Sequence, residues 1–449
     1  MEDLQILKEP LWKLFIKFVV PSVLAMVLVG IQGVVDGFFL GRYESVNAMS
    51  SVNVANPFMQ LILGGCFLIC IGMLSRMGRM IGANNKIEAQ NSFKTGLIAV
   101  LIFAIVFLVL GTIFHGSFAR LLGANNILYH DTSRYIFTLS FFIPFICLML
   151  LCGFSCRLIE KPHLYLIATV FCLFTNITLD FIMIKVFKTG VVGAAVSTGI
   201  SYIVGLLLVC IPFFKRRTIV HFFTGKFRFY ALKEMLFNGS SEGVSYLALA
   251  ISIFLFNRAF LHFAGEKGIA VFTVIHYITN FEELLMLGVA DGIATIISCN
   301  YGAKAYKRVQ QTLFWAVVLN AMIGIIIYAF LFFAGNGIMR IFIQGDNEIL
   351  SMAVTGAKLY GIAFLFNGYN ILQSSYYTAL GHSLASVLIS ASRGLVFIVI
   401  GIFILPILFK INGVWLTLPF AEIVTIFVSL FIFIFYRKTK SISAIDREK

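Results

Sequence analysis

The chain has 449 residues, of which 60% are hydrophobic and 12% are charged, and its formal net charge at pH 7 is +14. A mean hydropathy of +0.97 excludes an ordinary water-soluble protein of this size. The basic excess alone would fit nucleic-acid binding, but the positions of the basic residues favour the loops of a membrane protein.

The apolar residues occur in long blocks. A helix needs about 20 mostly apolar residues to cross a hydrocarbon core of about 30 Å. The opening MEDLQILKEPLWKLFIKF is mixed in charge and leads into a full-length span, so we expect no cleavable signal peptide. We predict twelve transmembrane helices, at residues 15–37, 52–74, 93–114, 133–155, 164–186, 190–213, 235–261, 268–293, 313–334, 352–378, 384–409 and 412–436.

The basic residues gather on one side of this arrangement. With an even number of helices, both termini lie on the same side of the membrane. That side receives the basic 214–234 segment, and also Lys8, Lys13, Lys17, Arg76, Arg79, Lys86, Lys94, Arg157, Lys161, Lys304, Lys307, Arg308, Arg437, Lys438 and Lys440. The opposite loops hold far fewer. By the positive-inside rule we expect both termini to be cytoplasmic.

The two halves of the chain repeat. Gly72, Gly82 and Gln90 correspond to Gly292, Gly302 and Gln310 at an offset of 220 residues, and GANNIL from Gly123 corresponds to GDNEIL from Gly345 at 222. Several matches in the same order indicate a duplicated six-helix unit. We therefore predict an all-α membrane protein of two pseudo-symmetric six-helix lobes, residues 1–213 and 235–449, around a central cleft. A cytoplasmic linker, 214–234, partly an amphipathic helix, joins them.

Acidic residues inside the spans are the candidate functional groups. An ionisable group at the bilayer centre costs about 2.5–3.5 kcal/mol on insertion scales, so such groups usually face an interior or a water-filled cavity. Arg393 is a basic residue within a span and a candidate partner for one of the acids. The acids are Asp36, Asp180, Glu242, Glu282, Glu283, Asp291 and Glu422.

Asp180 has the most informative surroundings. Asn176 precedes it by one helical turn, and Thr198 returns to a similar depth after a tight turn at 188–190. Together with Asp36 these residues offer only hard oxygen ligands, which suit Na⁺ or a proton and disfavour a soft transition metal. The structural alternative is that Asn176 and Asp180 only hydrogen-bond neighbouring helices.

The segments VPSVLAMVLVGIQGVVDGFFLGRY, NPFMQLILGG, NITLDFIMI, GVVGAAVSTGIS and SCNYGA resemble the multidrug and toxic compound extrusion (MATE) family, closest to its DinF-like and MepA/VmrA-like branches. The resemblance covers essentially the whole chain. It implies twelve helices in two lobes and export of drugs against an inward flow of Na⁺ or H⁺. In DinF-like members it also implies a coupling site in the first lobe, which maps onto Asp36, Asn176, Asp180 and Thr198.

The second lobe departs from another branch of this family. NorM-like members carry coupling acids on spans 7, 8 and 10, but span 10 of this chain, 352–378, contains no acid. We therefore expect the principal ion site in the first lobe. Glu242 matches the span-7 acid, and Glu242 and Glu282 are candidates for a substrate site or a second proton site; the alternative for each is a buried acid paired with a neighbouring helix.

Other residues have both a functional and a structural interpretation. Pro21 is a candidate bending point of the first helix. The glycines at 30, 33, 37 and 41 are expected to allow close approach of a neighbouring helix. Adaptable substrate contacts are expected from Met26, Met149, Met286 and Tyr369, although each could equally pack between helices.

The function expected from these observations is a multidrug efflux antiporter of the cell membrane, of the kind associated with antibiotic resistance. We expect a monomer that exports organic, mainly cationic compounds, contacts the lipid bilayer, binds no nucleic acid and uses Na⁺ or H⁺ without a cofactor. The nucleotide-binding motif G-x-x-x-x-G-K-[ST] does not occur, which argues against ATP as the energy source.

Two alternatives belong to other classes. A flippase for lipid-linked oligosaccharides has the same architecture but should have a more cationic cavity. A membrane-embedded transferase should have paired Asp clusters or a catalytic His, and no D-D-x-x-D motif occurs.

Overall fold

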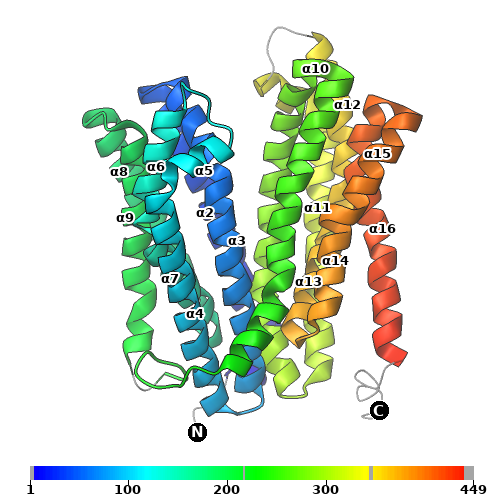
Figure 1. Ribbon diagram of the computed structural model, residues 1–449. Coiled ribbons are helices and arrows are strands. Elements are labelled where there is room, and N and C mark those ends of the chain that lie inside the picture. The colour runs from blue at the N-terminus through cyan, green and yellow to red at the C-terminus, as the bar shows by residue number, and fades with distance from the viewer. Residues whose placement is uncertain (1–4, 216–217, 343–346, 439–449) are drawn as a thin grey trace. The chain divides into compact units, whose positions relative to one another are not determined.

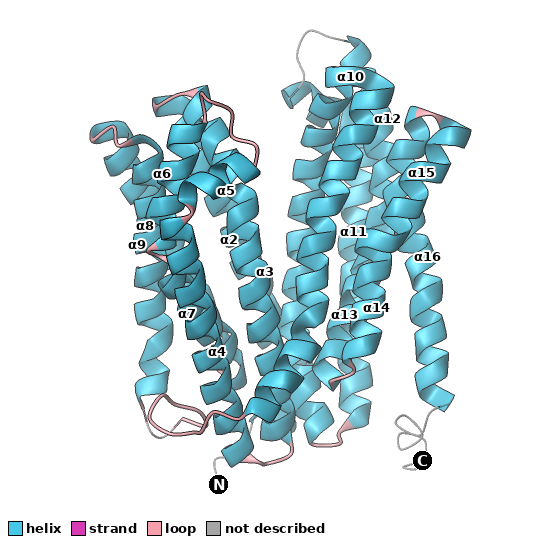
Figure 2. Ribbon diagram, viewed as in Figure 1, coloured by secondary structure: helices cyan, strands magenta, loops and turns pink. Residues whose placement is uncertain are grey.

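The computed structural model describes residues 5–215, 218–342 and 347–438, and this part of the chain is helical, without strands (Figure 2). The first half is built from α1 (Gln5–Lys8), α2 (Leu11–Tyr43), α3 (Val46–Gly82), α4 (Lys86–Ile113), α5 (His115–Leu121), α6 (Tyr129–Ser140), α7 (Ile143–Leu158), α8 (Pro162–Asp180), the π-helix η1 (Phe181–Val186), α9 (Gly190–Cys210) and the 3₁₀ turn η2 (Ile211–Phe214) (Figure 1).

The second half follows the same plan. Its elements are α10 (Phe229–Gly302), α11 (Tyr306–Phe342), α12 (Asn347–Gly361), the 3₁₀ turn η3 (Ile362–Leu365), α13 (Asn367–Leu380), α14 (Ser383–Ala391), the π-helix η4 (Ser392–Val396), α15 (Phe397–Phe409) and α16 (Ile411–Lys438).

The described residues contain the twelve predicted membrane spans. Ten continuous helical segments are long and apolar enough to cross a bilayer, and α6 with α7, bent by 53°, form an eleventh. The 74-residue α10 would be about 110 Å long if straight, several times a hydrocarbon core. Its backbone leaves the helical region at Gly265 (φ 62°, ψ −153°), inside the predicted gap at 262–267. Gly265 therefore divides α10 into two spans.

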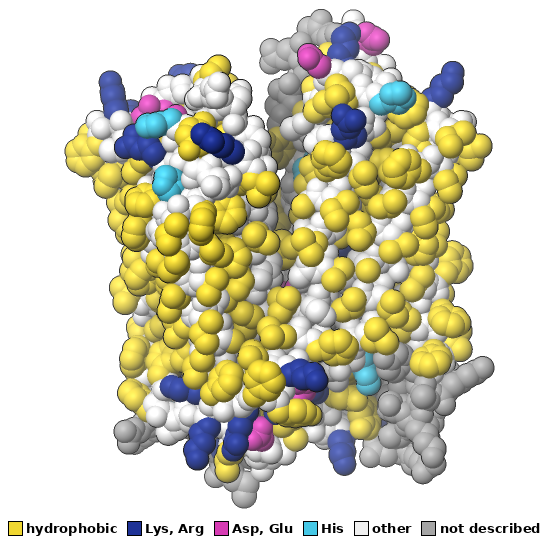
Figure 3. All heavy atoms as spheres, in the orientation of Figure 1, with side chains coloured by type: hydrophobic (Ala, Val, Ile, Leu, Met, Phe, Trp, Pro, Cys, Tyr) yellow, Lys and Arg dark blue, Asp and Glu magenta, His cyan; other side chains and the backbone are white. Residues whose placement is uncertain are grey.

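Packing divides the chain into two units, which correspond to the two lobes. The first extends to Gly243 and also takes Ser298–Lys304, whereas the second takes Val244–Ile297 and continues from Ala305. Both ends of α10 thus pack with the first unit. The lobe boundaries that the sequence repeat predicts, at residues 213 and 235, remain a prediction. On both units, hydrophobic side chains cover the middle of the face seen in Figure 3, and charged side chains lie toward its ends.

Glycines bring α3 close to the ends of α10 within the first unit. A Cβ atom at Gly72 would lie 2.0 Å from the Met235 carbonyl oxygen, and one at Gly82 would lie 1.9 Å from that of Cys299. The expectation for α2 is wrong at Gly33 and Gly37, because a Cβ at either position would have no atom within 4 Å. At Gly41 the same atom would lie 3.2 Å from Met49 Sδ of α3, so the expected close approach of α2 is present near its end.

The predicted linker, 214–234, is helical from Phe229, where α10 begins, whereas residues 218–228 form no helix. This segment binds α4 through its backbone instead. The Gln90 amide donates to the carbonyl oxygens of His221 (2.6 Å) and Thr224 (2.9 Å) and accepts from the His221 N–H (2.9 Å). The beginning of α10 is then fastened to α3 by Glu234, which pairs with Arg76 and Arg79.

The second unit has an aromatic core. Phe256, Phe260 and Phe272 of α10 pack together, and the Phe260 ring lies 4.1 Å from that of Trp415 in α16. This core holds α10 and α16 together.

Candidate ion-coupling site

The first unit places three helices around the predicted ion ligands. α8 packs against both α9 and α2, and its last α-helical residue is Asp180. The chain continues as the π-helix η1, whose wider turn is a feature found often at functional sites. The turn into α9 then uses positive φ angles at Lys188 (51°) and Gly190 (60°). The chain reverses tightly enough for α9 to run back beside α8.

Side-chain contacts fix the register of α2 against α9. The Gly190 N–H donates to Glu44 Oε1 (3.0 Å), and the Gln32 amide donates to Ser201 Oγ (3.4 Å). Between these contacts, Thr198 Oγ1 donates to Asp36 Oδ2 (3.2 Å). Asp36 precedes Glu44 by eight residues and Thr198 follows Gly190 by eight, so antiparallel helices of equal rise bring them to one level.

The structure brings all four predicted ligands together. Asn176, Asp180 and Thr198 lie next to the carboxyl group of Asp36. Asn176 and Asp180 are fully buried, and Thr198 is 7% exposed, whereas Asp36 is partly exposed. Five of their polar atoms are buried without a hydrogen-bond partner: Asp36 Oδ1, both carboxylate oxygens of Asp180, and both amide atoms of Asn176. Native proteins seldom leave such atoms unsatisfied, so this cluster has the properties of a ligand site.

Two neighbours of the site were not predicted. Ser197 lies beside Asp180 and is fully buried, and its hydroxyl has no partner. The adjacent pair Ser197–Thr198 could have revealed it, because two adjacent hydroxyls cannot both face lipid without cost. Tyr135 of α6 is close enough to both acids to interact with their charges. No feature of the sequence singles out this tyrosine.

The second unit has its own buried acids. Glu282 in α10 is fully buried and accepts a hydrogen bond from the Asn367 amide (2.9 Å), while its other oxygen has no partner. Glu422 in α16 accepts from the Asn370 amide (2.7 Å) and from Arg393. The expected pairing of Arg393 with an intramembrane acid is therefore present.

The remaining candidates are dispersed. Met149 is buried against Gly205 of α9, and Met286 is buried against Gly324 and Gly368, so both pack between helices. Their proposed substrate contacts stay a prediction, as do those of the partly exposed residues Glu242, Met26 and Tyr369. Pro21, the predicted bending point, lies inside the continuous helix α2.

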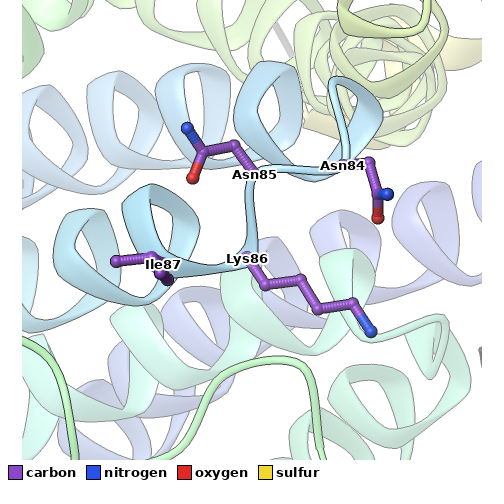
Figure 4. Close-up of a pocket in the computed structure, with 4 residues that line it drawn as sticks. All are labelled: Asn84, Asn85, Lys86 and Ile87. Carbon is purple, nitrogen blue, oxygen red and sulfur yellow. The ribbon is translucent and has the colours of Figure 1, made fainter.

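A hollow at the turn between α3 and α4 does not belong to this site. It is lined by Asn84, Asn85, Lys86 and Ile87, four consecutive exposed residues (Figure 4). It contains no acid, and we assign it no role.

Comparisons with known proteins agree with this architecture. A family model described as MatE matches residues 21–182 and again 243–404. The two matched stretches lie 222 residues apart, in agreement with the repeat. Multidrug export protein MepA of Staphylococcus aureus (strain bovine RF122 / ET3-1) is 24% identical over 418 residues, 92% of each chain. The Staphylococcus saprophyticus protein of the same name is 25% identical over 414 residues, 91% of this chain and 89% of its own.

Solved structures share the fold. An outward-facing multidrug resistance MATE family transporter of the MOP superfamily has a TM-score of 0.90 at 22% identity, covering 100% of this chain and 99% of its own. A MOP superfamily transporter from Pyrococcus furiosus Vc1 (DSM3638) has a TM-score of 0.89 at 22% identity, covering 96% of each chain. Because the family model matches both halves of this helical membrane protein, the chain belongs to the MatE family.

Proposed function

We propose that this transporter exports small organic compounds, mainly cations, in exchange for Na⁺ or H⁺ entering through the first unit. The observation that carries the proposal is the set of five unpartnered polar atoms shared by Asp36, Asn176 and Asp180. The staphylococcal relatives carry the name of multidrug export proteins, which supports the substrate class.

The chemistry of the site suits a small cation. Two carboxylates that face each other inside the membrane repel when both are ionised, and burial removes the water that would screen them. A proton shared by the pair removes one charge. A Na⁺ ion would use the carboxylate oxygens of Asp36 and Asp180, the amide oxygen of Asn176 and the hydroxyl of Thr198 as ligands. The buried Ser197 hydroxyl is one further oxygen at the same place.

The exposure of the ligands supports an order of events. Asp36 is partly exposed while Asn176 and Asp180 are buried, so an arriving ion meets Asp36 first. Binding then draws α2 toward α8 and α9. In α2, the nitrogen of Pro21 cannot donate a helical hydrogen bond, so the helix can bend there at low cost.

Coupling requires the ion to prefer one shape of this lobe and the drug to prefer the other. One charge that moves across a potential of 100 mV releases about 2.3 kcal/mol, which is roughly a fiftyfold bias. The energy is therefore sufficient to displace a bound drug.

Competition between ion and drug tests the proposal. Binding of a fluorescent organic cation such as ethidium is measured on the purified, reconstituted protein while Na⁺ is raised or the pH is lowered. In the wild type either change should weaken dye binding. Asp36→Asn should bind dye with hardly any ion dependence, whereas Asp131→Asn, which alters an exposed acid at the start of α6, should behave as the wild type. Equal ion sensitivity in Asp36→Asn and the wild type would exclude the acid pair as the coupling site.

A further inference from the structure

The second unit contains an intramembrane arginine between two acids. Glu283 of α10 and Glu422 of α16 lie on different helices, and Arg393 lies on η4 between α14 and α15. A guanidinium group within a membrane span is as costly as a carboxylate. An arginine at this place therefore needs an acidic partner, and it is a candidate functional group.

The contacts of Arg393 are specific. Its Nε donates to Glu422 Oε1 at 3.1 Å, and its Nη2 lies 3.0 Å from the same oxygen and 3.6 Å from Glu283 Oε1. The second oxygen of Glu422 accepts from the Asn370 amide at 2.7 Å. Glu422, with its side chain 1% exposed, is thus satisfied on both oxygens. The guanidinium is the positive group shared by the two carboxylates.

The backbone holds this guanidinium in place. Arg393 is part of the π-helix η4, in which the hydrogen-bond ladder is widened. The Ser252 hydroxyl of α10 donates to the Gly394 carbonyl oxygen at 2.7 Å. A Cβ at Gly394 would lie 2.9 Å from Ala248 Cβ, so glycine permits this close approach. The first half of α10 therefore fixes the π-helix, and the π-helix fixes the arginine.

The two units accommodate a pair of intramembrane acids in different ways. In the first, the two acids Asp36 and Asp180 are neighbours, with buried oxygens left unpartnered. In the second, Glu283 and Glu422 share a side-chain cation. We propose that Arg393 is a tethered cation that occupies a monovalent-cation site formed by Glu283 and Glu422, and that loss of its guanidinium opens this site to a free cation.

This assignment limits what the second unit exchanges. A cation joined to the backbone cannot cross the membrane, so Arg393 compensates one of the two negative charges of Glu283 and Glu422 without consuming an ion per cycle. Arg393 is then a positioning residue that keeps one positive charge between these two acids. The inference stands on the contacts of the second unit and does not depend on ion coupling at Asp36.

Chemical rescue tests the tethered cation. Arg393→Ala leaves a cavity with the shape of the lost side chain beside two acids. The Tm of the purified protein in detergent is followed during a titration with guanidinium chloride at low millimolar concentration, with choline chloride as a salt too bulky for the cavity. The Tm of Arg393→Ala should start below that of the wild type and rise to a plateau with guanidinium and, more weakly, with Na⁺. Choline should have no such effect.

Matched variants define the specificity of the rescue. Arg393→Lys keeps a positive charge and should need no added cation. Lys358→Ala removes a cation of the same unit that lies over the Phe332 ring, and its Tm should show no rescue. The titration is repeated in an Asp180→Asn background, where any first-unit ion site is disabled; rescue should persist there. The two failures are therefore distinguishable. Loss of ion competition at Asp36 would contradict the proposed function, and loss of guanidinium rescue would contradict the role of Arg393.

A Tm of Arg393→Ala that responds to guanidinium and Na⁺ no more than the wild type would overturn the proposal. If this variant cannot be purified, the cycle of Arg393→Met, Glu422→Met and the double variant gives the answer. Removing the cation alone leaves Glu283 and Glu422 uncompensated, whereas removing Glu422 as well leaves only Glu283. The double variant should therefore be more stable than Arg393→Met. A double variant whose destabilisation is the sum of the two single effects would also overturn the proposal.

Discussion

At the scale of single residues, some buried acids have hydrogen-bond donors for their oxygens and others do not. Glu422 has hydrogen-bond donors for both oxygens, whereas both oxygens of Asp180 have none. Since an unsatisfied buried polar atom costs about 1–3 kcal/mol, a site retains several of them only when a ligand or a change of state compensates. Asp180 and its neighbours fit that description.

Asp180→Asn should abolish ion-driven export, because the amide keeps the size of the side chain and loses the charge that attracts the ion. Uptake of dye into inside-out vesicles under imposed ΔpH or ΔNa⁺ measures this. Thr198→Val removes one oxygen and no charge, and should weaken ion binding about tenfold, which corresponds to about 1.4 kcal/mol. The Tm of Asp180→Asn should not fall, since a repulsive buried charge is lost. Wild-type export by this variant would remove Asp180 from the mechanism.

Glu160 gives a prediction about pH. It lies between α7 and α8, outside the spans, and its Oε1 accepts the Ile6 N–H at 2.7 Å. Burial raises its pKa above the ordinary glutamate value, and the Ile6 hydrogen bond and the nearby Lys17 offset only part of this. A carboxyl group with a raised folded-state pKa stabilises the fold below its unfolded pKa, about 4.3, and loses that contribution as the pH rises through the folded pKa.

The Tm of the wild type should therefore decrease between about pH 4 and neutrality through Glu160, and Glu160→Gln should remove that part of the slope. Differential scanning fluorimetry in detergent across this range measures both proteins. Glu348→Gln, an exposed glutamate paired with Lys267 in the other unit, is the control. Identical slopes for Glu160→Gln and the wild type would contradict the assignment.

At the scale of elements, glycine positions show which helices must approach closely. Gly72 and Gly82 of α3 face backbone carbonyls of α10, while Gly33 of α2 faces no atom within 4 Å. The contact between α3 and the start of α10 is further held by the Glu234 pairs with Arg76 and Arg79. We call this close-packed contact between α3 and the start of α10 the seam; Gly33 and Gly37 of α2 make no such contact.

Gly72→Ala tests the seam. The added methyl group would lie 2.0 Å from the Met235 carbonyl oxygen, so the helices must separate. Overpacking of this kind costs about 1–3 kcal/mol. The matched substitution Gly33→Ala makes the same chemical change in an open position and should leave the Tm equal or slightly higher. The measurement is the Tm of each purified variant. If Gly72→Ala lowers the Tm no more than Gly33→Ala does, the contact between α3 and α10 is not close-packed.

At the scale of the whole molecule, one duplicated six-helix plan supports two different sites. The family model matches both halves, yet the first unit has an Asp pair with an Asn and a Thr, and the second has two glutamates that share Arg393. Duplication therefore preserved the helices while their polar residues diverged. This asymmetry is what restricts the proposed ion exchange to one lobe.

Membrane orientation is the prediction that belongs to this scale. From the distribution of Lys and Arg residues we expect the linker to be cytoplasmic and the α5–α6 loop to be external. Thr224→Cys in the linker should be protected from a membrane-impermeant maleimide in intact cells, and Asn126→Cys should react; both positions are exposed on the protein. The wild-type protein is the background control, because seven of its eight cysteines are buried and Cys210 is half-buried. The reverse labelling pattern would invert the orientation and the direction of export.

The sequence by itself determined the number of spans, the break within 262–267, the repeat and the depth match between Asp36, Asn176, Asp180 and Thr198. These properties are local. Each residue's preference for hydrocarbon or water adds up along the chain, and depth follows from a fixed rise of 1.5 Å per residue.

The tertiary structure alone decided which face of each helix meets a neighbour. Gly33 has open space beside it although its spacing predicts a contact, Ser197 joins Thr198 at the candidate ion site, and Arg393 pairs with Glu422 and Glu283 among the seven acids. The physical reason is rotational. Each residue turns the helix by about 100°, and in hydrocarbon every apolar face is almost equally acceptable toward lipid or protein. Only the packing of all the helices together fixes the rotation of each one.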